Sequence, residues 1–185
     1  MSDRIIPFTY RPITKKKNAY PLFFTLLSVS LALVILSMQL EHYAGVVSVF
    51  AVVGLTASVL VYLRYIGGDY VYNVTVGSEG EAYFVIGKVV GKKITTMCVV
   101  KLESIIRIQM FTKNSENKYV PDKTVKRHNY APSFSPDEFA VMYTAGIDGR
   151  AEVVLECSKE FADRLMLYSE YAKEDSEREE NDEEE

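Results

Sequence analysis

The sequence predicts a pair of membrane-spanning α-helices followed by a mainly β domain that ends in one amphipathic helix. Three observations support this fold class. Uncharged apolar runs occupy residues 19–40 and 43–63, strand-period runs fill residues 69–157, and a helix-period apolar stripe begins near residue 158. The chain has 185 residues, of which 48% are hydrophobic. One soluble domain of about 100 residues therefore remains beside the two spans.

Each apolar run is long enough to cross a bilayer as an α-helix. Neither Ala19–Leu40 nor Tyr43–Leu63 contains a charged residue. At about 1.5 Å per residue, each run spans a hydrocarbon core of about 30 Å. Because lipid offers no hydrogen bonds to peptide groups, such a run satisfies its backbone as a helix. The alternative is a buried hairpin of a soluble protein, whose apolar runs are shorter and broken by polar residues.

Only Glu41 and His42 separate the two spans, which predicts an antiparallel transmembrane hairpin over residues 19–64 with both chain ends on one side. Basic residues flank the open end of the hairpin, whereas its turn contains no Lys or Arg. The positive-inside rule therefore places both termini in the cytoplasm and the hairpin in the plasma membrane. The basic residues expected at the anionic inner leaflet are Arg11, Lys15, Lys16, Lys17 and Arg64.

The two ends of the chain carry opposite charge, although the formal net charge is −4. Residues 1–18 are basic and contain Pro7 and Pro12, so we expect an extended tail that lies on anionic lipid. Residues 174–185 are almost wholly acidic, which predicts a disordered tail. The net negative charge and the lack of a basic stripe argue against nucleic acid as a partner.

Small residues recur along the second span at spacings that let helix backbones approach closely in lipid. They are Ala44, Ala51, Gly54 and Ser58. Packing against the first span explains this pattern, and so does a homo-oligomer formed through the same face. No ionisable residue lies inside either span, which argues against a transporter or a proton pathway.

The region after the spans shows the two-residue period of β-strands, separated by turn sequences. In the fourth expected strand, Ile106 and Ile108 should face the core. In the last, Val153 and Leu155 should face inward and Glu152 toward solvent. The expected strands cover residues 70–76, 82–90, 94–101, 106–110, 124–129, 139–144 and 151–157.

A closing helix is expected from Ser158 to about Lys173. Ser158 can cap the first turn, and apolar residues then recur at helical spacing to form one face for a sheet. That face consists of Phe161, Leu165, Tyr168 and Ala172, widened by Ala162 and Met166.

Residues 69–173 resemble a bacterial pleckstrin-homology-like (PH-like) domain, a fold commonly attached to membrane spans. The whole chain resembles uncharacterised two-span membrane proteins of Gram-positive, clostridial type. This resemblance implies a bent antiparallel sheet closed at one end by the C-terminal helix, and it transfers no activity. The segments that carry it are 67–72, 86–88 with 91–93, 130–133 and 157–160.

The resemblance also raises the question of phosphoinositide binding, which uses a basic first loop in the eukaryotic members that bind these lipids. Here that loop, residues 77–81, is acidic and would repel a phosphate. Lys88, Lys92 and Lys93 form a basic group at the next turn. This group is either a solvated turn or a ligand site.

No arrangement of catalytic, cofactor-binding or metal-ligating residues is evident, so we expect a protein that is not an enzyme and needs no cofactor. The histidines, His42 and His128, form no triad or zinc motif, and residues 87–93 lack phosphate-loop spacing. Cys98 and Cys157 each lie in an apolar run. We expect two buried thiols in a reducing compartment, with a disulfide as the alternative.

Two functions are compatible with these features. The first is a membrane-anchored interaction module, whose cytosolic β domain meets an unidentified protein partner or the inner membrane surface. The second is a structural or assembly subunit, in which the hairpin contacts a larger membrane complex.

Overall fold

The computed structural model describes residues 5–12, 19–40, 42–78, 80–113, 119–146 and 149–183, with side chains described as far as residue 178. The described residues form two compact units. The hairpin unit consists of Thr14–Asp69 and the loop Pro132–Ser135. The β domain consists of Met1–Ile13, Tyr70–Ala131 and Pro136–Glu185. Segments that precede the hairpin in sequence and segments that follow it therefore both contribute to the β domain.

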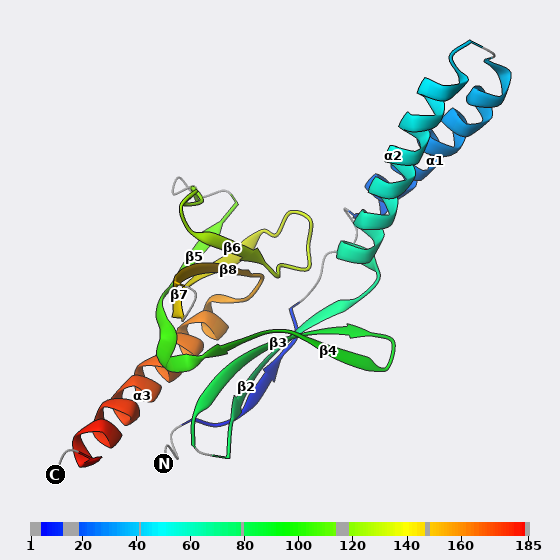
Figure 1. Ribbon diagram of the computed structural model, residues 1–185. Coiled ribbons are helices and arrows are strands. Elements are labelled where there is room, and N and C mark those ends of the chain that lie inside the picture. The colour runs from blue at the N-terminus through cyan, green and yellow to red at the C-terminus, as the bar shows by residue number, and fades with distance from the viewer. Residues whose placement is uncertain are drawn as a thin grey trace. The chain divides into compact units, whose positions relative to one another are not determined.

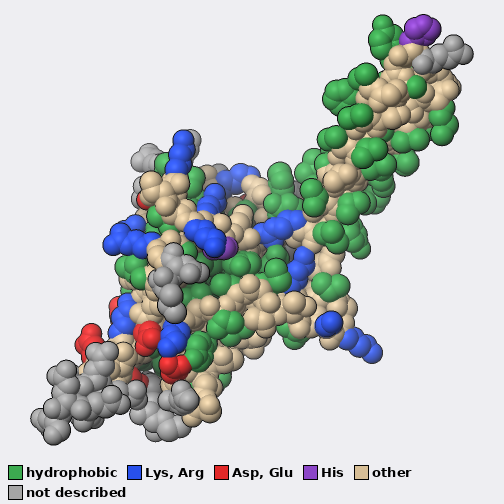
Figure 2. All heavy atoms as spheres, viewed as in Figure 1, with side chains coloured by type: hydrophobic (Ala, Val, Ile, Leu, Met, Phe, Trp, Pro, Cys, Tyr) green, Lys and Arg blue, Asp and Glu red, His purple; other side chains and the backbone are tan. Residues whose placement is uncertain are grey.

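The hairpin unit contains two helices that are long and apolar enough to cross a membrane, as predicted. They are α1 (Ala19–Gln39) and α2 (Ala44–Val61), and α2 continues into a π-helical turn, η2 (Tyr62–Ile66). The helices lie side by side, and apolar side chains cover the face of the pair that Figure 2 displays (Figures 1 and 2). At the base of α2, the ring of Phe134 lies 5.4 Å from that of Tyr65.

The small residues of α2 pack inside the hairpin. Ala51 and Ser58 are each 1% exposed. A Cβ atom added at Gly54 would lie 2.2 Å from the hydroxyl oxygen of Ser30 on α1, so glycine permits this close approach. Of the two explanations for the spacing of Ala44, Ala51, Gly54 and Ser58, packing against the first span is therefore confirmed for Ala51, Gly54 and Ser58. Association of two chains through them stays a prediction.

The first sheet of the β domain has the strand order β1-β2-β3-β4. Its strands are β1 (Phe8–Tyr10), β2 (Asp69–Val76), β3 (Ala82–Val90) and β4 (Lys93–Lys101). The β1–β2 and β3–β4 pairs are antiparallel. A 3₁₀ turn, η3 (Leu102–Ser104), leads from β4 into the second sheet.

The second sheet has the order β5-β7-β8-β6. Its strands are β5 (Ile105–Thr112), β6 (Lys126–Asn129), β7 (Glu138–Gly146) and β8 (Gly149–Leu155). The β5–β7 and β7–β8 pairs are antiparallel, whereas β6 runs parallel to β8. The strands expected from the sequence are all present, so the predicted β-rich region followed by a helix is confirmed.

Helix α3 (Lys159–Glu183) packs its apolar stripe on both sheets. The hydroxyl of Ser158 accepts a hydrogen bond from the backbone N–H of Phe161 at 3.3 Å, so Ser158 caps the helix as predicted. Phe161, Leu165 and Tyr168 lie in one buried cluster with Tyr72 and Phe84 of the first sheet.

The expectation that residues 1–18 form a basic tail is wrong for the described residues 5–12. Phe8 pairs with Val74 and Tyr10 with Tyr72, which makes β1 an edge strand of the first sheet. The Tyr10 ring lies 4.3 Å from that of Phe161, and Ile5 is buried. Pro7 and Pro12 flank this three-residue strand. It is too short to show the two-residue period of a β-strand, so the sequence did not predict it.

The expectation that residues 174–185 are a disordered tail is wrong as far as Glu183, where α3 ends. Half of the residues in the extension, 174–183, are Glu, Arg178 lies among them, and Lys173 precedes them. Glu, Lys and Arg are good helix formers, and a helix already anchored by packing needs no new nucleus to continue. Lys173 fixes this part of α3, because its ammonium donates a hydrogen bond to the carbonyl of Ile105.

The start of β5 also differs from the expected register. Ile105 pairs with Thr144 and Arg107 with Tyr143, so the strand bulges at Ile106. The bulge buries Ile105 in the core and leaves Ile106 exposed, the reverse of what alternation predicted. Ile108 packs against the core as expected.

Candidate functional site

Beyond Gly87, β3 and β4 continue as a two-stranded ribbon, residues 87–97, which we call the β3–β4 ribbon (Figure 1). Gly91 forms its turn with φ +61°, a left-handed conformation that glycine adopts without strain. The register shifts between Ile86 and Gly87, so Met97 has no partner in the ladder. Such a bulge bends and twists the strands that follow it.

The β3–β4 ribbon projects from the end of the sheet at which β2 begins. The ammonium of Lys88 lies 5.8 Å from the centre of the Tyr70 ring. A Cβ at Gly87 would lie 3.0 Å from Val71, so the ribbon passes close against the first residues of β2. In sequence, β2 starts three residues after η2 ends.

The ribbon exposes apolar and basic side chains together. Val90, Ile94 and Met97 are 54%, 57% and 45% exposed. Lys92 and Lys93 are exposed beside them and Lys88 is half-buried, which brings together the three lysines that the sequence singled out. No Asp or Glu occurs between Ala82 and Leu102. The ribbon therefore combines exposed apolar side chains with basic side chains, and its own residues include no carboxylate.

The other basic residues expected at the membrane surface are placed less completely. Arg11 is exposed and follows β1, and Arg64 is half-buried in η2 with its guanidinium 5.3 Å from the Tyr65 ring centre. Lys15, Lys16 and Lys17 lie outside the described residues. No described contact joins these residues into one site.

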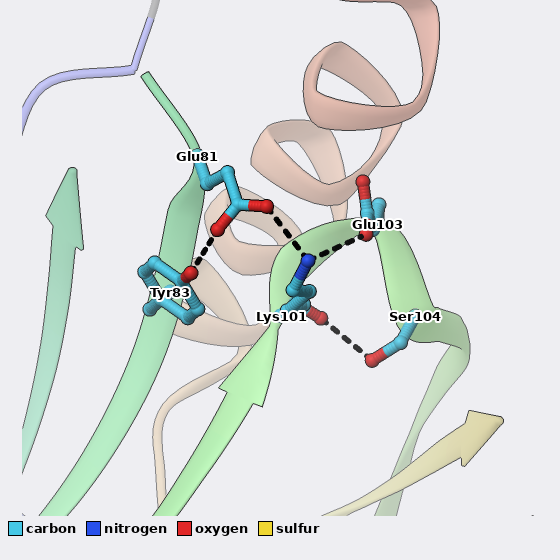
Figure 3. A network of polar contacts seen from close by, with 5 residues as sticks. All are labelled: Glu81, Tyr83, Lys101, Glu103 and Ser104. Carbon is cyan, nitrogen blue, oxygen red and sulfur yellow. Dashed lines mark hydrogen bonds and ion pairs between the residues drawn. The ribbon is translucent and has the colours of Figure 1, made fainter. Parts of the chain in front are cut away.

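Where β4 meets η3, a polar network fixes the chain (Figure 3). The ammonium of Lys101 lies 2.7 Å from one oxygen of Glu81 and 3.6 Å from Glu103. The hydroxyl of Tyr83 donates to the other oxygen of Glu81, and that of Ser104 donates to the carbonyl of Lys101. The bond from Lys101, followed by that from Tyr83, lowers the pKa of the Glu81 carboxyl. This network neutralises the charge of Lys101.

A groove of about 590 Å³ opens beside this network, between β4 and β6, and we call it the edge groove. Strand β4 contributes Val99, Val100 and Lys101, and η3 contributes Glu103 and Ser104. The opposite wall is formed by two residues of β6 and by the β7–β8 hairpin. These residues are Lys126, His128, Thr144, Ala145, Gly149, Arg150 and Ala151.

On its outer face, the second sheet buries a carboxylate that the sequence placed in solvent. Glu152 is 1% exposed, because Tyr119 covers it and donates a hydrogen bond to it. Burial and this bond raise the pKa of the Tyr119 hydroxyl. The guanidinium of Arg127, paired across the strands with Glu152, lies 4.9 Å from the Tyr119 ring centre. Strand alternation correctly placed Glu152 on the outer face of the sheet, but it could not show that the segment containing Tyr119 covers this face.

The two cysteines are free thiols, so the alternative of a disulfide is wrong. Cys157 is buried in the core, and burial raises the pKa of its thiol to about 12. Cys98 is half-buried on β4, and partial burial raises its pKa as well. A protonated thiol is a poor nucleophile, so neither cysteine has the environment of a reactive thiolate.

Among the described residues, no group of three or more His, Cys, Asp and Glu side chains could hold a metal ion. His128 stacks its ring on that of Tyr130, with 6.3 Å between the ring centres. Comparison with known proteins gave no match to a family model, a curated protein or a solved structure.

Proposed function

We propose that this chain is a membrane-anchored, non-enzymatic interaction module whose PH-like β domain lies against the inner surface of the plasma membrane. The observation that carries the proposal is the β3–β4 ribbon, in which exposed apolar side chains lie beside the exposed Lys92 and Lys93 and whose residues 87–97 include no Asp or Glu. The hairpin of α1 and α2 supplies the anchor. Anionic lipid is the partner of the ribbon.

The surface chemistry of the hairpin supports its insertion into lipid. Large apolar side chains such as Ile35, Phe50 and Leu60 are each more than half exposed. Polar side chains in the helices donate to carbonyls of their own helix, at 2.7 Å for Ser30 and 2.9 Å for Thr56. Hydroxyl groups in a bilayer need hydrogen-bond partners within the protein, because the hydrocarbon core offers none, and these hydroxyls have such partners in their own helices.

Strand pairing supports the proposed topology. The segment before α1 and the segment after α2 meet in one sheet as β1 and β2. If the hairpin crosses the membrane, both of its open ends must then lie on the same side. The basic residues around those ends favour the cytoplasmic side.

The PH-like assignment draws support from two four-stranded sheets with one C-terminal helix packed on both. The β domain departs in two ways from the seven antiparallel strands that the sequence and the resemblance predict. An additional strand, β1, precedes the hairpin, and β6 runs parallel to β8.

Lipid matches the ribbon in both charge and polarity. Each lysine near an anionic surface contributes about 1 kcal/mol, and Val90, Ile94 and Met97 add apolar area that can enter the headgroup region. The affinity of the ribbon for lipid is too weak to hold a free protein on the membrane, but the hairpin already confines the domain there. The ribbon then has only to orient the domain.

A fluorophore that reports polarity tests this contact in full-length protein reconstituted into vesicles. Nitrobenzoxadiazole is attached at Val90→Cys or at Ser78→Cys, with Cys98→Ser and Cys157→Ala in both. Ser78 lies in the turn between β2 and β3, at the other end of the sheet. We expect blue-shifted emission at position 90 in vesicles rich in phosphatidylglycerol, and water-like emission at position 78.

Lysine-to-glutamine variants test whether the positive charge of the ribbon causes the shift in emission. Lys92→Gln with Lys93→Gln is expected to reverse most of the shift at position 90, whereas Lys123→Gln, an exposed lysine outside the ribbon, leaves it unchanged. Equal, water-like emission at positions 78 and 90 in anionic vesicles would refute the lipid contact.

A further inference from the structure

The edge groove lies between two strands that are both edges. In the described part of the chain, β4 pairs only with β3, and β6 pairs only with β8. Each therefore presents backbone N–H and C=O groups on its other side, which is the template for adding a strand. At one end, the hydroxyl of Tyr130, the residue after β6, comes within 3.5 Å of the Met97 carbonyl, so a side chain bridges the two edges there.

The groove offers an extended segment both apolar and polar side chains. Val99, Val100, Ala145 and Ala151 give it apolar walls. Lys126 and His128 lie on the same strand face, two residues apart, and Lys126 pairs with Ala151 of β8. A strand laid between β4 and β6 would thus meet both apolar and polar side chains.

The charge of the groove is positive. Of the basic residues lining it, Lys101 is neutralised by Glu81 and Glu103. Lys126 and Arg150 are exposed, and within the described residues neither makes an ion pair or a side-chain hydrogen bond. Glu103 is the only carboxylate that lines the groove among the described residues, and it faces Lys101. Figure 2 shows Lys and Arg side chains gathered over the region of β6.

We propose that the edge groove binds an extended acidic peptide segment of a partner protein, which adds a strand between β4 and β6. Backbone hydrogen bonds to the two edges supply affinity, and acidic side chains paired with Lys126 and Arg150 supply specificity. The site is distinct from the β3–β4 ribbon, so a domain resting on lipid can hold a protein at the same time.

A library of random short peptides, displayed on phage and selected on the full-length chain in neutral detergent, tests the proposal. We expect enrichment of acidic sequences that alternate with apolar, β-forming residues. Binding of an enriched peptide should weaken about tenfold in the Lys126→Glu, Arg150→Glu variant, since two exposed charge pairs are lost and reversed. The matched control, Lys113→Glu with Lys123→Glu, reverses two exposed lysines outside the groove and should bind as the unmodified chain does.

The mode of binding is tested on the peptide itself, which avoids variants that fail to fold. N-methylation of alternate residues removes the donors of one edge of an added strand and is expected to abolish binding. Several results would overturn the proposal: no acidic enrichment, binding that survives the Lys126→Glu, Arg150→Glu change, or full binding of the methylated peptide. Displacement of the peptide by short-chain phosphatidylglycerol would also overturn it, because the groove would then be a lipid site. The lipid contact of the ribbon does not enter this measurement.

Discussion

Leu165→Asp is expected to unfold the β domain. The Leu165 side chain is 0% exposed and lies in the cluster that joins α3 to both sheets. The substitution removes apolar burial and places a carboxylate there without a partner, at a combined cost of about 3 kcal/mol or more. That loss is a large share of the 5–15 kcal/mol or so by which domains are typically stable.

Leu167→Asp is the matched control, because Leu167 lies on the same helix and is 42% exposed. The chain contains no Trp, so near-ultraviolet circular dichroism of its 13 tyrosines reports the packing of the domain. We expect that signal to disappear in Leu165→Asp and to persist in Leu167→Asp. If both variants kept the signal and the same melting temperature, α3 would not pack as described.

Removal of β1 is expected to be at least as damaging. Phe8 lies 5.7 Å from Phe161 and 5.8 Å from Tyr168, ring centre to ring centre. The hydroxyl of Tyr10 accepts a hydrogen bond from the backbone N–H of Ser158 at 3.0 Å. Without β1, the apolar burial of Ile5, Phe8 and Tyr10 is lost, on the order of 5 kcal/mol.

Two soluble proteins test this prediction. One contains residues 69–183 alone, and the other joins residues 5–12 to residue 69 through a short Gly-Ser linker in place of the hairpin. We expect cooperative melting only in the linked protein. Within it, Tyr10→Ala should lower the melting temperature strongly, whereas Thr9→Ala, an exposed position on the same strand, should not. Equal melting of the linked and unlinked proteins would show that β1 is dispensable.

Local patterns predicted much of this fold because local interactions determine those parts. Uncharged runs predicted α1 and α2, alternation predicted that Val153 and Leu155 face the core, and helical spacing predicted the buried stripe through Leu165. In each case, a residue's environment depends mainly on its position within one element.

The features that the sequence did not predict depend on partners distant in the chain. β1 becomes a strand by pairing with β2, on the far side of the hairpin. Glu152 is buried because Tyr119 covers it, and Ile105 replaces Ile106 in the core because the strand bulges against β7. Helix α3 continues to Glu183 because its first turns are held by packing and the residues that follow include good helix formers. The acidic composition of these residues alone had predicted disorder.

The two candidate surfaces differ in the same respect. Lys88, Lys92 and Lys93 are close in sequence, so their grouping at one turn was visible without a structure. The edge groove was not visible in the sequence, because it forms between β4 and β6, which are edge strands of two different sheets. That arrangement follows from strand order, which periodicity does not determine.

Accessibility of single cysteines in intact cells is the most direct test of the proposal that the β domain is anchored to the membrane and lies in the cytoplasm. His42→Cys reports the hairpin turn and Ser78→Cys reports the β domain, each with Cys98→Ser and Cys157→Ala. A membrane-impermeant maleimide should label position 42 in intact cells and position 78 only after permeabilisation. Labelling of position 78 in intact cells, or equal labelling of both positions, would contradict the proposed placement.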